Sequence, residues 1–411
     1  MLRSTKHIVC ALSGGLDSAV AAFLLKSKGF TVSGVHLVSD DPSGEFKDKP
    51  EEAAENAHRV CKQLGIPLQE VHLTKEYWDK VFRETTKGNQ NLGLTSLDAV
   101  CNKHITFGTL ISHVLNDIKA HGFATGHGAR LTQDIIRNNV DPARGVKLLR
   151  ASEQLKDQTY SLSQVSQRAL QKTVFPVGEL PALVVRDIAV QNGLDTIVKK
   201  GEDSSLCSYG RSSFQRFVKE HKLPKPGRYV DLETSQTVGE HDGAVSWTVG
   251  QQVHIQGHNE EMYVAEVLTD VDSNTCDIMV VSNQDHPALF AQTFFTRLPH
   301  WIHEIPFKLV ETEMLDCEYQ QNHGGQLRKC TMTLASSNSY CGHDYLIVSC
   351  PDSVKGITPG QHVAFYKGEE CLGSAQILRP GPSVYAMTYG TERRKKVEEN
   401  TFYQKWFSKI F

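Results

Sequence analysis

The hexapeptide Ser13-Gly14-Gly15-Leu16-Asp17-Ser18 lies between an apolar run at residues 7–12 and an alanine- and leucine-rich run at residues 19–25. Such an order predicts a strand, a tight loop and a helix. The two glycines let backbone N–H groups approach a phosphate, and the positive end of the following helix favours negative charge. We therefore expect a phosphate-binding loop. A bare carboxylate would repel phosphate, so Asp17 suggests an intervening Mg²⁺.

This loop differs from the common nucleotide-binding loop, because the chain has no G-x-x-x-x-G-K-[ST] match and no lysine follows the glycines. Ser-Gly-Gly-x-Asp-Ser resembles the PP-loop of the ATP pyrophosphatases. Those enzymes hold the β,γ-pyrophosphate of ATP while an acceptor oxygen attacks the α-phosphate, which leaves an adenylated acceptor. The alternative is a glycine-rich turn that binds nothing.

The bulk properties are those of a globular protein of more than one domain. The chain has 411 residues and a formal net charge of −3, which predicts two or three domains of ~100–200 residues and confines any RNA contact to a local basic patch. No apolar run approaches the ~18 residues of a membrane span, and the first strand begins too early for a signal peptide, so we expect no membrane partner. The ten cysteines include no C-x-x-C pair, which fits a reducing compartment.

The first half of the chain alternates between strand and helix patterns. Strands are expected at residues 31–38, 68–73 and 123–127, and helices at 50–64, 76–86, 98–120 and 181–191. This alternation predicts an α/β fold with a doubly wound parallel sheet, whose ligands lie at the carboxyl ends of the strands. The loop, Leu37 and Thr125-Gly126-His127 follow such strand ends, so we expect them to line one pocket.

Beyond about residue 223, short β-rich runs follow a cluster of proline and glycine. We expect strands at 227–232, 244–249, 262–267 and 275–281, and a paired set at 360–366 and 371–377. The predicted domains are a PP-loop catalytic domain at 1–222, a central small β domain at 223–290 and a C-terminal β-barrel-like domain at 291–380. A basic tail occupies 381–411.

Two cysteines are candidates for chemistry. Asp98 is expected to cap the helix at 98–120, and Cys101 shares its face one turn later. A helix N-terminus lowers a thiol pKa, and Asp98 is placed to act as an acid or base; taken alone, Cys101 also fits a buried structural cysteine. Cys207 lies in a polar, glycine-flanked loop at 201–210, where the alternative is a surface thiol with no role.

Several further motifs occur in order along nearly the whole chain. With the PP-loop, they resemble the tRNA-specific 2-thiouridylase family, called MnmA in bacteria and TRMU in mitochondria. They are Asp98-Ala99-Val100-Cys101-Asn102-Lys103, Ile105-x-Phe107, Ala124-Thr125-Gly126-His127, Lys156-Asp157-Gln158-Thr159-Tyr160, Phe175-Pro176-Val177-Gly178-Glu179-Leu180, Asp203-Ser204-x-x-Cys207 and Thr358-Pro359-Gly360-Gln361.

The resemblance implies an ATP-dependent sulfurtransferase. ATP would adenylate the C2 oxygen of the wobble uridine, U34, and a persulfide on Cys207 would deliver sulfur to C2. Cys101 would be the partner nucleophile and Asp98 the acid or base beside the flipped base. The residues implied to bind ATP are Ala11, Leu12, Ser13, Gly14, Gly15, Leu16, Asp17, Ser18, Leu37 and Gly126. Those implied to contact tRNA are His127, Lys156, Asp157, Gln158 and Gln361.

The same resemblance implies the partners. These are the tRNAs for lysine, glutamate and glutamine, and a persulfide donor such as a cysteine desulfurase or a sulfur carrier. Basic positions of the bacterial pattern have changed while both cysteines remain, which resembles a mitochondrial member; a cytoplasmic location is the alternative. Two other functions stay open: another PP-loop adenylating ligase, such as an amidotransferase-type synthetase, and a non-catalytic tRNA-binding protein.

Overall fold

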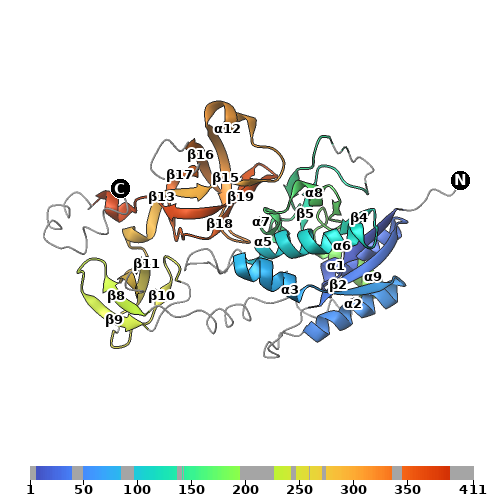
Figure 1. Cartoon of the computed structure of the whole chain (residues 1–411), viewed down its shortest axis with the longest axis horizontal. Helices are drawn as coiled ribbons and strands as arrows, with labels where there is room; N and C mark the ends of the chain where they lie inside the picture. Colours follow the sequence, from blue (N-terminus) through green and yellow to red (C-terminus); the bar gives the residue numbers. More distant parts are fainter. Residues whose placement is uncertain are drawn as a thin grey trace.

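The computed structural model describes residues 6–38, 50–84, 97–136, 141, 143–194, 226–241, 247–258, 260–270, 275–335 and 345–388. Figure 1 shows an α/β region at the end that carries the N-terminus, a β-barrel beside it and a small sheet toward the opposite end. Within these ranges, no helix is both long and apolar enough to cross a membrane.

The α/β region is built on five parallel strands in the order β3-β2-β1-β4-β7. The parallel sheet confirms the predicted fold class, and β1, β2 and β4 lie side by side in its centre. Their bounds are β1 (His7–Ala11), β2 (Thr31–Val38), β3 (Leu68–His72), β4 (Gly122–Ala124) and β7 (Thr173–Val174).

Helices cover both faces of this sheet because successive strand residues point to opposite sides. Ile8 and Cys10 of β1 pack into a buried cluster with α1 (Leu16–Ser27), α2 (Pro50–Leu64) and α9 (Ala182–Gln191). Val9 packs on the opposite face, against the helical run that begins at α5. Each buried aliphatic side chain contributes about 1.5–3 kcal/mol relative to an exposed one.

Two predicted helices differ from the expectation. The segment predicted as one helix at 98–120 comprises α5 (Leu97–Cys101), the π-helix η3 (Asn102–Leu110) and α6 (Ile111–Asn116). The segment predicted at 76–86 comprises α3 (Thr74–Glu76) and the π-helix η1 (Tyr77–Phe82). Asp98 lies inside the first turn of α5 and not at its cap.

The small sheet has the strand order β10-β11-β12-β8-β9. The predicted strand at 244–249 is wrong over its described part, because residues 247–249 form no strand. Trp247 and Val249 pack instead against the buried clusters of this sheet. The strands are β8 (Gly227–Asp231), β9 (Thr237–His241), β10 (Gln252–Val253), β11 (Met262–Asp270) and β12 (Thr275–Val281).

The barrel sheet contains strands from both halves of the chain. β13 pairs with both β17 and β19, which closes the barrel, and β18 pairs with β19 as predicted. At the other edge of β19, β6 (Leu148–Arg150) and β5 (Ala129–Leu131) extend the sheet from within the α/β region. The remaining bounds are β13 (Phe290–Arg297), β14 (His300–Trp301), α12 (Phe307–Thr312), β15 (Met314–Gln320), β16 (Arg328–Ala335), β17 (Tyr345–Lys355), β18 (His362–Lys367) and β19 (Glu370–Pro380).

Buried hydrogen bonds fasten the barrel to the α/β region. The hydroxyl of Tyr160, in α7 (Thr159–Leu162), donates to the carbonyl of His362 at 3.0 Å. Ser163 Oγ donates to Ser374 Oγ at 2.8 Å, and Gln164 Nε2 donates to the Ser374 carbonyl at 3.1 Å. Because these polar groups are withdrawn from water and paired, separating the two parts would leave several of them unsatisfied.

Candidate functional site

The loop at residues 13–18 is preformed. Gly14 has φ +81°, a conformation that favours glycine, and a Cβ there would overlap the backbone of Ala53 in α2. Ser18 Oγ donates to the Gly15 carbonyl at 2.9 Å and accepts from the Ser13 N–H at 3.3 Å. The two serine hydroxyls therefore brace the turn that directs the chain into α1.

Gly126 is the point where β4 meets this loop. A Cβ at Gly126 would lie 2.5 Å from Ser18 N and 2.6 Å from Asp17 C, so only glycine fits without displacing the loop. Leu37, near the end of β2, packs at the edge of the cluster that includes Val9 and Val35. The structure thus brings the predicted loop, Leu37 and Gly126 to the carboxyl ends of three adjacent strands.

Lys156 reaches this loop from a distant part of the chain. Its Nζ lies 3.8 Å from Oδ2 of Asp17, and the two side chains are 27% and 37% exposed. Lys156 ends the short 3₁₀ helix η4 (Gln154–Lys156). The sequence interpretation missed this pairing, because it assigned Lys156 to tRNA by resemblance and nothing in the local pattern relates the two positions.

The two residues after Lys156 are held by hydrogen bonds, Asp157 in a buried position and Gln158 in a partly buried one. Arg150 Nε donates to the Asp157 carboxylate at 2.8 Å, and Thr159 Oγ1 donates to it at 2.9 Å. Gln158 Oε1 accepts the Gly128 N–H at 2.8 Å, while the Gln158 N–H donates to the Gly128 carbonyl at 2.9 Å. The predicted tRNA-contact residues Asp157 and Gln158 therefore fix the backbone that carries Lys156.

His127 lies between the loop and the helix that carries Cys101. Its ring is 5% exposed and packs 5.6 Å from the Phe107 ring of η3, and its Nδ1 lies 2.8 Å from Thr125 Oγ1. Among the described residues, none hydrogen-bonds its Nε2. A buried ring nitrogen without a hydrogen bond destabilises the fold. A hydrogen bond from this nitrogen to a substrate would offset that cost.

Burial, followed by the charge of His323, lowers the pKa of His127 to about 4. The folded state thus resists protonation more than the unfolded state, so stability is full above pH 6.5 and is lost as pH falls toward 4. Between pH 7.5 and 5 this one group should cost about 2 kcal/mol of unfolding free energy. Urea unfolding of wild type and His127→Gln at both pH values measures it; the variant should lose less stability on acidification.

The matched control for this prediction is His58→Gln, since His58 is 59% exposed and pairs with Glu70 at the surface. It should leave the pH dependence of unfolding nearly as in wild type, apart from the small contribution of a surface ion pair. An equal loss of stability on acidification in wild type and His127→Gln would contradict the assignment of a depressed pKa to His127.

Asp98 and Cys101 occupy one face of α5, as their spacing predicts. Asp98 is 7% exposed, and Cys101 is 5% exposed inside the cluster that holds Val9. The next residue, Asn102, donates from Nδ2 to the Ser161 carbonyl at 3.2 Å, which ties α5 to α7. Cys207 lies outside the described residues, so its predicted approach to Cys101 stays a prediction.

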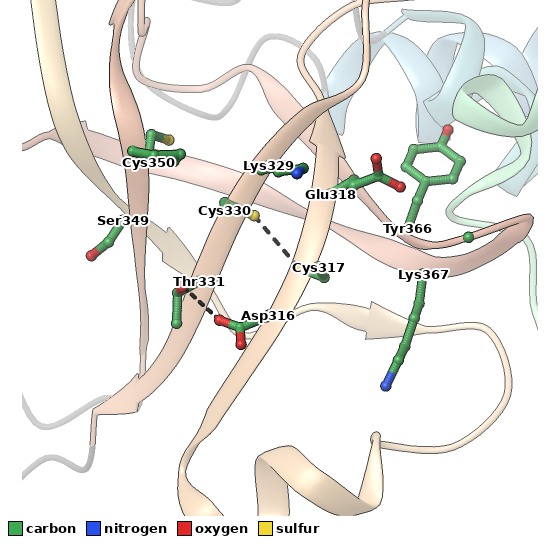
Figure 2. Close-up of a pocket in the computed structure, with 12 residues that line it drawn as sticks. Asp316, Cys317, Glu318, Lys329, Cys330, Thr331, Ser349, Cys350, Tyr366 and Lys367 are labelled. Atoms are coloured by element: carbon green, nitrogen blue, oxygen red, sulfur yellow. Dashed lines mark hydrogen bonds between the residues drawn. The ribbon is translucent and has the colours of Figure 1, made fainter.

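Burial does not set Cys101 apart from the other thiols of this fold. All eight cysteines of the described ranges are buried. Cys317 and Cys330 face each other across β15 and β16 with 3.4 Å between the sulfurs, beside a cavity of about 630 Å³ (Figure 2). The hydrogen bond with Cys317, followed by burial, raises the pKa of Cys330 far above its ordinary value. Such protonated thiols are poor nucleophiles, and no predicted site residue lines this cavity.

The residues present fit a Mg²⁺ held mainly by nucleotide phosphates. Within the described ranges, no group of three or more His, Cys, Asp or Glu side chains is arranged to hold a metal. Mg²⁺ commonly uses one or two carboxylates and completes its shell with phosphates and water, and Asp17 offers one partly exposed carboxylate at the loop.

Gln361, the remaining predicted tRNA contact, is 7% exposed and lies one residue before β18.

Comparison with known proteins agrees with this architecture. Three family models match in order: a tRNA methyl transferase HUP domain at residues 6–210, a tRNA methyl transferase PRC-barrel domain at 215–282 and an aminomethyltransferase beta-barrel domain at 291–377. Mitochondrial tRNA-specific 2-thiouridylase 1 of Gallus gallus is 38% identical over 96% of this chain and 97% of its own length. The chain belongs to the tRNA-specific 2-thiouridylase family.

Bacterial members of the 2-thiouridylase family also match. The tRNA-specific 2-thiouridylase MnmA of Legionella pneumophila is 34% identical over 90% of this chain and 98% of its own length. Among solved structures, a 4-thiouridine synthetase in complex with RNA and ATP aligns over 49% of this chain and 45% of its own, with 18% identity and a TM-score of 0.33. Membership of the 2-thiouridylase family rests on the sequence relatives.

Proposed function

We propose that this chain is an ATP-dependent tRNA sulfurtransferase that converts the wobble uridine U34 to 2-thiouridine. The observation that carries the proposal is the chain of contacts from the loop to α5. Gly126 abuts the loop at Asp17 and Ser18, and the adjacent His127 packs against Phe107 of the helical run that bears Cys101. A phosphate loop and a cysteine are thereby held by one short segment.

The proposed reaction has two steps. In the first, the C2 oxygen of uridine attacks the α-phosphate of ATP, and pyrophosphate leaves. In the second, the terminal sulfur of a persulfide on Cys207 attacks C2, and the oxygen departs with AMP. Cys101 then attacks the Cys207 sulfur, which forms a disulfide and leaves the transferred sulfur on C2. In the alternative route, Cys101 attacks the persulfide first, which forms the same disulfide and releases hydrosulfide that attacks C2.

Named residues serve each step of this proposal. Backbone N–H groups of residues 13–18 and the N-terminus of α1 bind the pyrophosphate, and Mg²⁺ at Asp17 would supply charge neutralisation for the leaving group. Asp98 acts as the acid or base that transfers a proton to or from the flipped uracil. His127 Nε2 contacts the flipped nucleotide, while Gln361 contributes a tRNA contact from the barrel.

The partners proposed follow from the family. The substrates would be the tRNAs for lysine, glutamate and glutamine, and the sulfur would come from a cysteine desulfurase or a sulfur carrier. Relatives such as that of Gallus gallus carry a mitochondrial name, which supports a mitochondrial location. A non-catalytic tRNA-binding role is less favoured, because it does not explain why a phosphate-binding loop is braced by serine hydroxyls and packed against Gly126.

The test is reconstitution with the purified full-length chain. Unmodified tRNA, ATP, Mg²⁺ and a persulfide donor should yield 2-thiouridine at position 34, detected by mass spectrometry of nucleosides, with AMP and pyrophosphate formed in equal amounts. Omission of ATP should stop the reaction. Thiolation without ATP, or pyrophosphate release at the same rate with and without tRNA, would contradict the proposal.

A further inference from the structure

The phosphate loop lacks a cation of its own. Residues 13–18 contain a carboxylate but no lysine or arginine, and none follows until Lys26 at the end of α1. The β,γ-pyrophosphate of ATP carries several negative charges, which backbone N–H groups alone neutralise only in part. Phosphate sites commonly add a lysine as a point charge.

We propose that Lys156 is this missing cation and binds the β,γ-pyrophosphate of ATP. The inference rests on the proposed function, because it assigns a residue to the same ATP site. The carrying observation is the approach of Lys156 Nζ to within 3.8 Å of Asp17 Oδ2, at the first turn of α1. An ammonium group that reaches this carboxylate lies at the mouth of the loop.

The backbone around Lys156 is rigid enough to keep that ammonium in place. A Cβ on Gly128 would overlap the carbonyl oxygen of Lys156, so the two segments are in direct contact. The reciprocal bonds between Gly128 and Gln158 hold this contact, and the four hydrogen bonds to the Asp157 carboxylate hold the following turn. The side chain thus starts from a fixed point.

One segment positions both halves of the site. Gly126 abuts the loop and Gly128 abuts Lys156, with His127 between them. The ion pair with Asp17 is partly exposed and therefore weak, so exchanging it for phosphate costs little. With nucleotide bound, Lys156 contacts the pyrophosphate oxygens and Asp17 is left to face Mg²⁺.

The experiment compares ATP and AMP, because AMP lacks the β- and γ-phosphates. Calorimetry with the full-length chain and Mg²⁺ should show ATP affinity weakened about 10- to 100-fold in Lys156→Ala, as expected for loss of a charged hydrogen bond. AMP affinity should stay unchanged. Affinity for an unmodified tRNA transcript, measured by filter binding, should also stay unchanged, and Lys156→Arg should recover most of the ATP affinity.

A matched control is Lys147→Ala, since Lys147 also forms an ion pair, with Glu370 at 2.9 Å, but at the barrel edge. It should leave binding of both nucleotides as in wild type. The inference is overturned if Lys156→Ala weakens only tRNA binding, or weakens ATP and AMP equally, as a distorted loop would. A wild-type chain that binds no ATP would contradict the proposed function itself.

Discussion

Cys207→Ser should abolish 2-thiouridine formation while adenylation of tRNA continues. The C2 oxygen of uridine is a poor leaving group until it forms an ester with AMP, so activation precedes the attack of sulfur. Activation needs the loop at residues 13–18 and no thiol. With ³²P-labelled ATP and unmodified tRNA, the variant should accumulate adenylated tRNA and no thiolated product.

Labelled sulfur distinguishes the two cysteines in the same assay. A persulfide donor should load sulfur onto the wild-type chain and onto Cys101→Ser, but not onto Cys207→Ser. Cys101→Ser is the matched control. It removes a thiol that is buried on α5 but leaves Cys207, the residue proposed to carry the persulfide. Loading that survives loss of Cys207 and disappears with Cys101 would reverse the two roles.

Gly126→Ala should lower kcat/KM for ATP by about 10²-fold, the scale on which a displacement of ~1 Å impairs a positioned reaction. Its backbone φ lies outside the region that favours glycine, so the added methyl acts only through its approach to Ser18 N and Asp17 C. The loop must shift to admit it. Pyrophosphate release at varied ATP concentration measures the effect.

Gly29→Ala is the matched control for this variant. Gly29 follows the C-cap of α1 with φ +85°, and a Cβ there meets nothing within 4 Å. It should lower stability by about 1 kcal/mol through backbone strain and leave kcat/KM for ATP unchanged. An unaltered kcat/KM for ATP in Gly126→Ala would mean that the nucleotide phosphates bind elsewhere.

Local sequence patterns predicted the centre of the α/β region well. The bounds predicted for β2 and α2 match the structure, because each has a clear period and a defined end. Asp98 and Cys101 share a buried face, as their spacing of three residues requires. The π-helical turn of η3 was missed, since a period near 3.6 is also satisfied by most of its apolar residues.

Contacts between distant segments could not be predicted in the same way. β5 and β6 have three residues each, and β6 pairs with β19 more than 200 positions away. The approach of Lys156 to Asp17 depends on two glycines, at 126 and 128, whose neighbours only the folded chain defines. The run at 244–249 has β-forming residues, but residues 247–249 form no strand, and Trp247 and Val249 pack against the buried clusters of the small sheet.

The attachment of β6 to β19 has a consequence for truncated forms of this protein. A premature stop codon ahead of β18 would remove the strand that covers the edge of β6, and bare strand edges promote aggregation. The same loss would remove both partners of the Gln164 amide and one partner each of the Tyr160 and Ser163 hydroxyls, at about 1–3 kcal/mol for a polar group left buried and unpaired. Nonsense alleles ahead of β18 would therefore act by depleting the whole protein, including the α/β region that they leave encoded.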